Sequence, residues 1–294
     1  MEKLTRKRKL YLPLRRRGVI IAMRMKKKSA NKTLLLVLPA LLLSGCGKSL
    51  SRLDAATLLG NVVSYVGSSE FETPKSWTIE ETGKGKLSNG SLSYEGSFSS
   101  AHHYSEEDHY FHSTLSVEGK VGAALSLKYT SEEWIYIDLM TVSGAKVYPV
   151  VEAAADGIAG TKNYVMTYYS SLEQAITAFN AKSDVIEEQS RLKDLSSVPS
   201  SLKDQLSSID KSAVVSETYS TSAELSLIAN LTYKEDDVSK SEKITIKEGF
   251  LQNVAQDDGT LSLTTAYNWN LSKSSKPDLG SYSVSGSPSL SKGD

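Results

Sequence analysis

The fold is decided by residues 91–119, SLSYEGSFSSAHHYSEEDHYFHSTLSVEG. Apolar and polar residues alternate on both sides of the polar tip 105–108, and a period of two is typical of half-buried strands. If this tip is a four-residue loop, Phe98 faces Leu115, and the apolar residues of both strands share one face. The stretch therefore predicts an antiparallel hairpin with one apolar side.

The alternation continues through most of the remaining sequence. Asn89-Gly90 is a strong turn signal before this stretch, and a second hairpin is predicted around Ser131-Glu132-Glu133. Residues 225–233 alternate without interruption, and Asp257-Asp258-Gly259 marks another turn. The sequence thus predicts two groups of antiparallel strands that make up a large sheet.

Helices are predicted before the first group of strands and between the two groups. Ser51 followed by Asp54 resembles a capping box, and apolar residues recur after it at helical spacing. These apolar residues are Ala55, Leu58, Leu59, Val62 and Val66. A second capping signal at Ser170 begins a helical insert over about 170–210, which Pro199 is expected to break.

The predicted order is therefore helix, strands, helical insert, strands. This order favours one α+β domain over residues 52–285, with a large antiparallel sheet that carries the N-terminal helix and the insert on one face. The last segment, 286–294, is expected to be a flexible tail.

A secretory signal precedes the predicted domain. Residues 25–45 hold three consecutive lysines, an apolar run from Leu34 to Leu43, and small residues at the end. The run is far shorter than the roughly twenty residues that cross a bilayer as a helix. Its end, Leu43-Ser44-Gly45-Cys46, resembles the lipobox of bacterial lipoproteins. The resemblance implies that Cys46 is diacylated and that residues 46–51 form a lipidated tether.

The basic residues concentrate before this point. We interpret residues 1–24 as an upstream extension that results from a misplaced start codon, and the alternative is a long cationic start of the signal peptide. Without residues 1–45 the chain keeps 21 basic and 33 acidic residues, a formal charge of about −12. Since this charge repels phosphate backbones, nucleic acid is not expected as a partner. The expected location is extracytoplasmic, anchored by lipid to the cell membrane, or to the outer membrane in a cell with two membranes.

The order of elements over residues 50–285 resembles that of LolA-type and LppX/LprG-type lipoproteins, whose curved half-barrel sheet and covering helices enclose an apolar cavity. The resemblance implies a protein of the cell envelope that binds or carries a lipid or another hydrophobic ligand. Inward residues of the paired strands would line the cavity, namely Phe98, Leu115, Leu127, Ile137, Leu227 and Leu231. The same residues equally suit a packed core without a ligand.

The alternative function is that of a structural or adhesive surface lipoprotein. Trp77, Trp134, Trp269 and many tyrosines lie on the predicted strands or near their ends, and exposed aromatic rings can stack on sugars or on peptide side chains. Such a protein would bind a protein or a glycan through the outer face of its sheet.

Catalytic and metal sites find little support in the sequence. All four histidines fall within residues 102–112, and the predicted register places His102 and His109 on one face as a candidate metal pair. With at most two imidazoles on a face, a closed four-ligand site is hard to build. No Gly-x-Ser-x-Gly or His-Glu-x-x-His motif occurs, and Cys46 is the single cysteine. We therefore expect no enzymatic activity and no cofactor.

Overall fold

Long strands form because a strand turns successive side chains to opposite faces, and the alternating stretches match that period. The computed structural model describes residues 47–89, 92–121, 125–270, 275–285 and 289–290 of the 294-residue chain. The predicted upstream extension, the predicted signal peptide and Cys46 lie outside the described residues.

The strands are β1 (Lys48–Ser49), β2 (Ser76–Asn89), β3 (Leu92–Ser105), β4 (Tyr110–Val121), β5 (Leu125–Ile137), β6 (Met140–Val142), β7 (Ala145–Asp156), β8 (Thr161–Tyr169), β9 (Val214–Thr221), β10 (Leu227–Glu235), β11 (Val238–Lys247), β12 (Phe250–Asp257), β13 (Leu261–Trp269), β14 (Ser283–Val284) and β15 (Ser289–Leu290). The helices are α1 (Arg52–Val66), α2 (Leu172–Asn180), α3 (Ser183–Ser190) and α4 (Asp194–Ser208), with short 3-10 turns η1 (Arg191–Lys193), η2 (Lys211–Ala213) and η3 (Leu279–Ser281).

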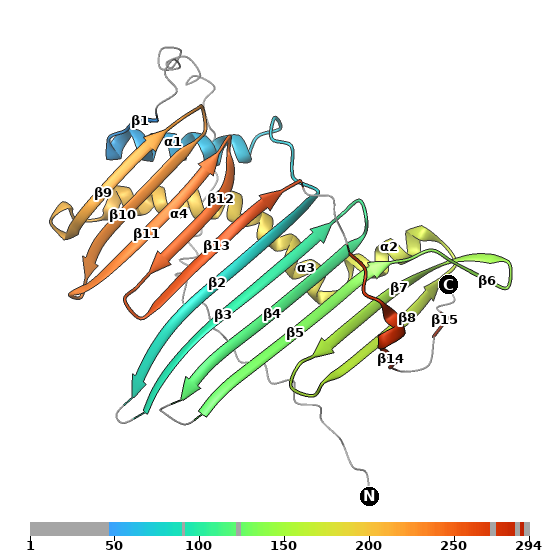
Figure 1. The fold of residues 1–294 in the computed structure, drawn as a ribbon. Coiled ribbons are helices and arrows are strands. Elements are labelled where there is room, and N and C mark those ends of the chain that lie inside the picture. Colours follow the sequence, from blue (N-terminus) through green and yellow to red (C-terminus); the bar gives the residue numbers. More distant parts are fainter. Residues whose placement is uncertain (1–46, 90–91, 122–124, 271–274, 286–288, 291–294) are drawn as a thin grey trace, which may run out of the picture. The chain divides into compact units, whose positions relative to one another are not determined.

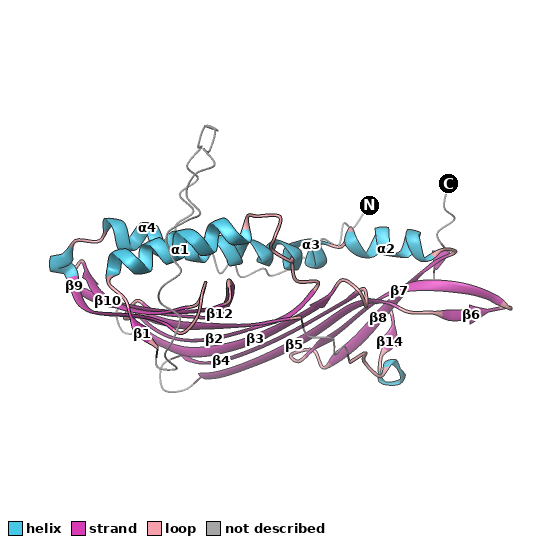
Figure 2. Ribbon diagram, turned by 90° about the horizontal axis from the view of Figure 1, so that it is seen from above, coloured by secondary structure: helices cyan, strands magenta, loops and turns pink. Residues whose placement is uncertain are grey.

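One large sheet contains most of these strands. Its order is β1-β9-β10-β11-β12-β13-β2-β3-β4-β5-β7-β8-β14 (Figure 1). Neighbouring strands are antiparallel, except that the short β14 and β15 pair with β8 in parallel. The sheet is curved and open, and α1 to α4 all lie on one of its faces (Figure 2). The predicted α+β fold is therefore confirmed.

Local sequence signals account for the start of α1. The Ser51 side chain accepts a hydrogen bond from the Asp54 backbone N–H, and the Asp54 carboxylate accepts one from the Ser51 backbone N–H. This is the predicted capping box. Ala55, Leu59 and Val62 are fully buried against the sheet, as their spacing predicts.

The helical insert differs from its prediction at two residues. Ser171, not Ser170, caps α2, and its side chain accepts a hydrogen bond from the Gln174 backbone N–H. Pro199 does not break the insert, because it lies inside α4 and is buried. A proline inside a helix removes one intrahelical hydrogen bond and crowds the preceding turn, and burial of the apolar side of α4 offsets this cost.

The register of the first hairpin is shifted by two residues from the predicted one. Phe98 faces Val117 rather than Leu115. The reason is that Ser105 belongs to the strand and pairs with Tyr110, so the turn occupies residues 106–109 instead of 105–108. The Ser105 side chain holds this turn through a hydrogen bond with the Asp108 carboxylate. Since the shift is an even number, every residue keeps its predicted face.

The hairpin predicted around residues 131–133 is wrong. These residues lie inside β5, which runs without interruption from Leu125 to Ile137 and pairs with β4 along its length. Ser131-Glu132-Glu133 contains no glycine, asparagine or proline to turn the chain, and its side chains suit an extended strand.

Two hydrophobic clusters lie on the two faces of the sheet. The larger one is between the sheet and the helices, and the residues of α1 pack there with Trp77, Ile79 and Tyr104. The smaller one is on the outer face, where Tyr110, Trp134 and Tyr136 are buried among the neighbouring side chains. Burying a side chain of this size stabilises a fold by about 1.5–3 kcal/mol.

Short paired segments lie at both ends of the described chain. Within the predicted tether 46–51, β1 pairs with β9, and Leu50 donates a backbone hydrogen bond to the Tyr219 carbonyl. Within the predicted tail 286–294, β15 pairs with β8. Leu279 and Tyr282, which precede it, pack on the outer cluster.

Candidate functional site

An apolar surface continues on the helix side of the sheet beyond the place where the helices end. Residues of β3, β4, β5 and β13 form it, at even spacings from core residues of the same strands. We call this surface the open face; its residues are Phe98, Leu115, Val117, Leu127, Tyr129, Leu261 and Leu263. None of them belongs to either hydrophobic cluster, and Leu127 is 53% and Leu261 41% exposed.

The register arranges the open face in rows that cross the strands. One row runs through Leu263, Gly83, Phe98, Val117 and Tyr129, which are successive cross-strand neighbours. The next row, away from the helices, runs through Leu261, Gly85, Gly96, Gly119 and Leu127.

Three adjacent glycines in the second row, of which Gly119 is buried and Gly85 and Gly96 are half-buried, place no side chains between the two exposed leucines. Glycine weakens a strand interior, and it often marks a site where a ligand or another backbone approaches closely. The distance from Leu261 to Leu127 covers four strand spacings, about 19 Å. This strip has the length of an extended hydrocarbon chain rather than of a compact molecule.

The opposite side of the same strands is polar. Alternate residues there include Lys84, Lys86, Ser97, Ser116, Glu118, Lys120 and Lys128. Lys128 and Glu118 form an exposed ion pair across β4 and β5, with 2.8 Å between Nζ and Oε1. The strands are therefore amphipathic in this region, and none of the described helices covers their apolar side.

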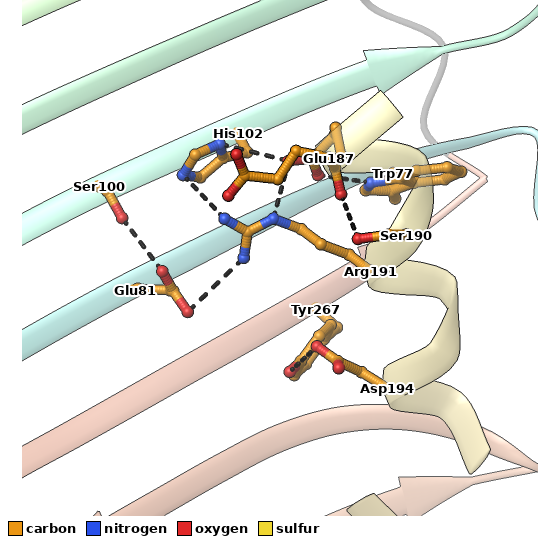
Figure 3. A network of polar contacts seen from close by, with 10 residues as sticks. Trp77, Glu81, Ser100, His102, Glu187, Ser190, Arg191, Asp194 and Tyr267 are labelled. Carbon is orange, nitrogen blue, oxygen red and sulfur yellow. Dashed lines mark hydrogen bonds and ion pairs between the residues drawn. The ribbon is translucent and has the colours of Figure 1, made fainter. Parts of the chain in front are cut away.

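A buried polar network lies where the helices meet the open face (Figure 3). Glu188 of α3 is 2% exposed, and its carboxylate accepts a 2.7 Å hydrogen bond from Trp77 Nε1. The same carboxylate lies 2.8 Å from Arg191 Nε and 3.3 Å from His102 Nδ1. Arg191 also contacts Glu81, which is two residues from Gly83 along β2. The network thus joins the insert to β2 and β3 at the edge of the open face.

Ionised groups predominate in this network. Burial alone raises the pKa of Glu188, but the hydrogen bond with His102 and the charge of Arg191 outweigh burial and hold this pKa below its usual value. Burial alone lowers the pKa of Arg191, while Glu188, Glu81 and other nearby acids raise it above its usual value. The pair is therefore charged in the folded protein.

The side chain of Tyr267 completes the network on the β13 side. Its hydroxyl donates a 3.1 Å hydrogen bond to Asp194 at the start of α4. Burial, and then the charge of Asp194, raise the pKa of this phenol far above its usual value. Tyr267 is therefore a neutral donor that fixes the end of η1 over the sheet.

The six predicted cavity residues divide into two groups. All six lie on the helix side of the sheet, as predicted. Ile137, Leu227 and Leu231 are buried in the larger cluster, where they act as core. The other three, Phe98, Leu115 and Leu127, lie on the open face.

A depression of about 330 Å³ lies elsewhere in the sheet, on β10 to β13. Its lining is largely polar and includes Asn230, Thr232, Lys243 and Asp257, with Leu231 as its single large apolar side chain. This lining does not suit a hydrocarbon ligand, so the open face is the better candidate site.

The two histidines of the candidate metal pair have different neighbours. His102 is held by Glu188 and Arg191, whereas the ring of His109 lies 6.2 Å from that of Phe179 in α2. In the described part of the chain, no three His, Cys, Asp or Glu side chains are grouped so that they could hold a metal ion.

The tryptophans that would bind a partner in the alternative function, an adhesive surface lipoprotein, are not exposed. Trp77 and Trp134 are buried, and Trp269 is half-buried and donates a hydrogen bond to the Leu251 carbonyl. Trp134 stacks on His112 with ring centroids 4.7 Å apart, and Tyr282 covers it edge-on. On the outer face, these rings are therefore part of the packing.

Sequence reasoning missed the polar network, because residues 183–195 look like an exposed charged helix. The spacing did contain a signal, because Glu188 follows the buried Val185 by three residues and precedes Arg191 by three.

No described helix is long and apolar enough to cross a membrane. The chain matches no protein family, and no curated protein is significantly similar to it.

Proposed function

We propose that this protein is an exported lipoprotein, anchored through a diacylated Cys46, that holds a lipid or another hydrophobic ligand on its open face without catalysing a reaction. The location rests on the signal sequence and the lipobox. The binding activity rests on the open face.

The observation that carries the proposal is the exposure of Leu127 and Leu261 on the face that elsewhere forms the core. Apolar surface in contact with water costs about 25 cal/mol per Å², and contiguous apolar patches on soluble domains mark binding sites. Phe98 and Val117 are half-buried and lie on β3 and β4, between the strands of these two leucines and one row nearer the helices. Together with Leu127 and Leu261 they form one apolar patch rather than scattered positions.

The surroundings of the patch favour an amphiphile over a purely apolar molecule. The glycine row offers a strip without side chains for a chain, while Glu81 and Ser100 lie four residues away from it along β2 and β3, at the edge of the polar network. Serine hydroxyls and carboxylates accept or donate hydrogen bonds, which a polar head group needs.

The proposed anchor would hold one edge of the sheet near the membrane. Only Gly47 separates Cys46 from β1, and β1 is paired with β9 at the edge of the sheet. A diacylated cysteine provides two acyl chains, which hold a protein on a bilayer far longer than one chain does.

Titration with a fluorescent fatty acid tests the binding site. Leu127→Gln introduces a polar group on the open face, and Lys128→Gln makes the same side chain at the next residue, on the opposite face. Loss of one buried leucine contact is expected to weaken binding about ten-fold or more in Leu127→Gln. Lys128→Gln should bind as the unsubstituted protein does. Equal affinities in both variants would contradict the proposed site.

A further inference from the structure

A two-stranded arm extends from the end of β5. It comprises Leu139 to Val147, in which Met140 pairs with Val147 and Val142 with Ala145. Figure 2 shows β6 reaching away from the rest of the sheet, with β7 as its single partner. Ser143 and Gly144 have φ values of 50° and 83°, which define a tight two-residue turn. A Cβ at Gly144 would have no atom within 4 Å, so the tip stands free.

One side of the arm is apolar. Leu139 is 56% and Val142 45% exposed, and Met140 is also exposed. Since directly opposite residues share a face, Met140 and Val142 lie on one side with Ala145 and Val147, whereas Leu139 lies at the base of the other side, which carries Thr141 and Lys146. The arm is therefore amphipathic, with its single cation beside the tip.

Charge separates the arm from the other turns of the sheet. Between Leu139 and Val151 the single charged residue is Lys146, and no acid occurs. Several other turns that the structure describes carry acids, for example at 106–108, 235–237 and 257–258. Anionic lipids repel such turns, whereas they do not repel an arm that carries one lysine and no acid.

We infer that the arm inserts its tip, Val142 to Ala145, into the interface of a lipid bilayer. The three paired residues of the whole arm span about 10 Å, so insertion of the tip stays within the 5–10 Å depth at which apolar side chains of peripheral proteins reside. Lys146 follows the tip directly, and its side chain would reach the level of the phosphates, because a lysine extends its charge toward water or anionic head groups. The contact is a second one beside the proposed lipid anchor, and it does not depend on a ligand at the open face.

The mature lipoprotein in vesicles of phosphatidylcholine and phosphatidylglycerol provides the test. Val142→Cys places a thiol on the arm, where an NBD fluorophore is attached, and Thr141→Cys serves as a second reporter. Ile158→Cys is the control, because Ile158 is 76% exposed at another turn, beside Asp156. The expected result is blue-shifted emission and quenching by spin-labelled lipids at residues 141 and 142, and neither at 158. Lys146→Glu should reduce the quenching at 142.

Emission at 141 and 142 that matches the control at 158 and does not respond to the spin-labelled lipids would overturn the inference. The protein without an added cysteine shows separately whether the anchor exists. Cys46 is the single cysteine of the chain, so an acylated protein takes up no label. Labelling of that protein would refute the acylation, while the comparison of residues 142 and 158 would still test the arm.

Discussion

The ring of Phe98 lies over the backbone of Gly83, its cross-strand neighbour in β2. A Cβ at Gly83 would overlap three atoms of this ring. The glycine therefore allows the ring to lie flat against the sheet at the border of the open face, and the position of Phe98 depends on the absence of a side chain at residue 83.

Gly83→Ala is expected to destabilise the protein by about 1–3 kcal/mol, because the new methyl group forces the Phe98 ring out of its place. Thermal unfolding measures the effect. A second glycine-to-alanine variant, Gly144→Ala, would not serve as a neutral control, because the φ of Gly144 is positive and alanine is strained there. Gly83→Ala combined with Phe98→Ala is informative instead, because removal of the ring should relieve most of the added cost. A fully additive double variant would contradict the overlap.

Glu188→Ala is expected to destabilise the protein by about 3–5 kcal/mol. It removes the partner of the buried Arg191 guanidinium and leaves Trp77 Nε1 without its acceptor. Chemical denaturation measures the loss. Glu187→Ala is the matched control, because Glu187 is the exposed neighbour in the same helix, and its change should stay within about 0.5 kcal/mol. Similar losses in both variants would mean that the network does not stabilise the insert.

The stability should fall as the pH decreases below about 6.5, the ordinary pKa of histidine. Burial, and then the charge of His112, lower the pKa of His103, and burial also lowers the pKa of His112 in spite of Glu132. The unfolded chain therefore takes up these protons at a higher pH than the folded one, which favours unfolding. His103→Gln should weaken the pH dependence of the melting temperature between pH 7 and 5. A variant with unchanged pH dependence would show that His103 does not contribute.

Tyr282→Ala should expose Trp134 on the outer face. The Tyr282 ring meets the Trp134 ring edge-on, with centroids 6.1 Å apart, and packs on the smaller cluster. We expect a loss of about 1–3 kcal/mol, less than for a fully buried aromatic ring, and a red shift of the tryptophan fluorescence. Val284→Ala, at an exposed residue nearby, is the control and should change neither quantity. Identical spectra for Tyr282→Ala and the unsubstituted protein would contradict this contact.

Local signals in the sequence predicted local structure. The Ser51–Asp54 capping box and the apolar side of α1 need only neighbouring residues to form, and both agree with the structure. The faces of the strands were also predictable, because alternation decides them whatever the exact pairing is. The pairing itself was missed by two residues, since it depends on which residues close the turn after Ser105.

Features that depend on distant residues were not predictable. Ser131-Glu132-Glu133 resembles a polar tip by itself, but β4 and β7 flank it and keep it extended. The segment after Ser275 has few apolar residues, yet Tyr110 donates a hydrogen bond to the Ser275 carbonyl across 165 positions. The division of the six candidate cavity residues into core and open face likewise follows from where the helices end.

The most direct test of the proposed function is mass spectrometry of the lipids that copurify, without a covalent bond, with the mature protein. The proposal predicts acyl-chain lipids in organic extracts of the unsubstituted protein and of Lys128→Gln, in similar amounts. Leu127→Gln, which differs from them on the open face, should retain much less. Extracts that contain no lipid, or equal amounts from all three proteins, would contradict a hydrophobic ligand on the open face.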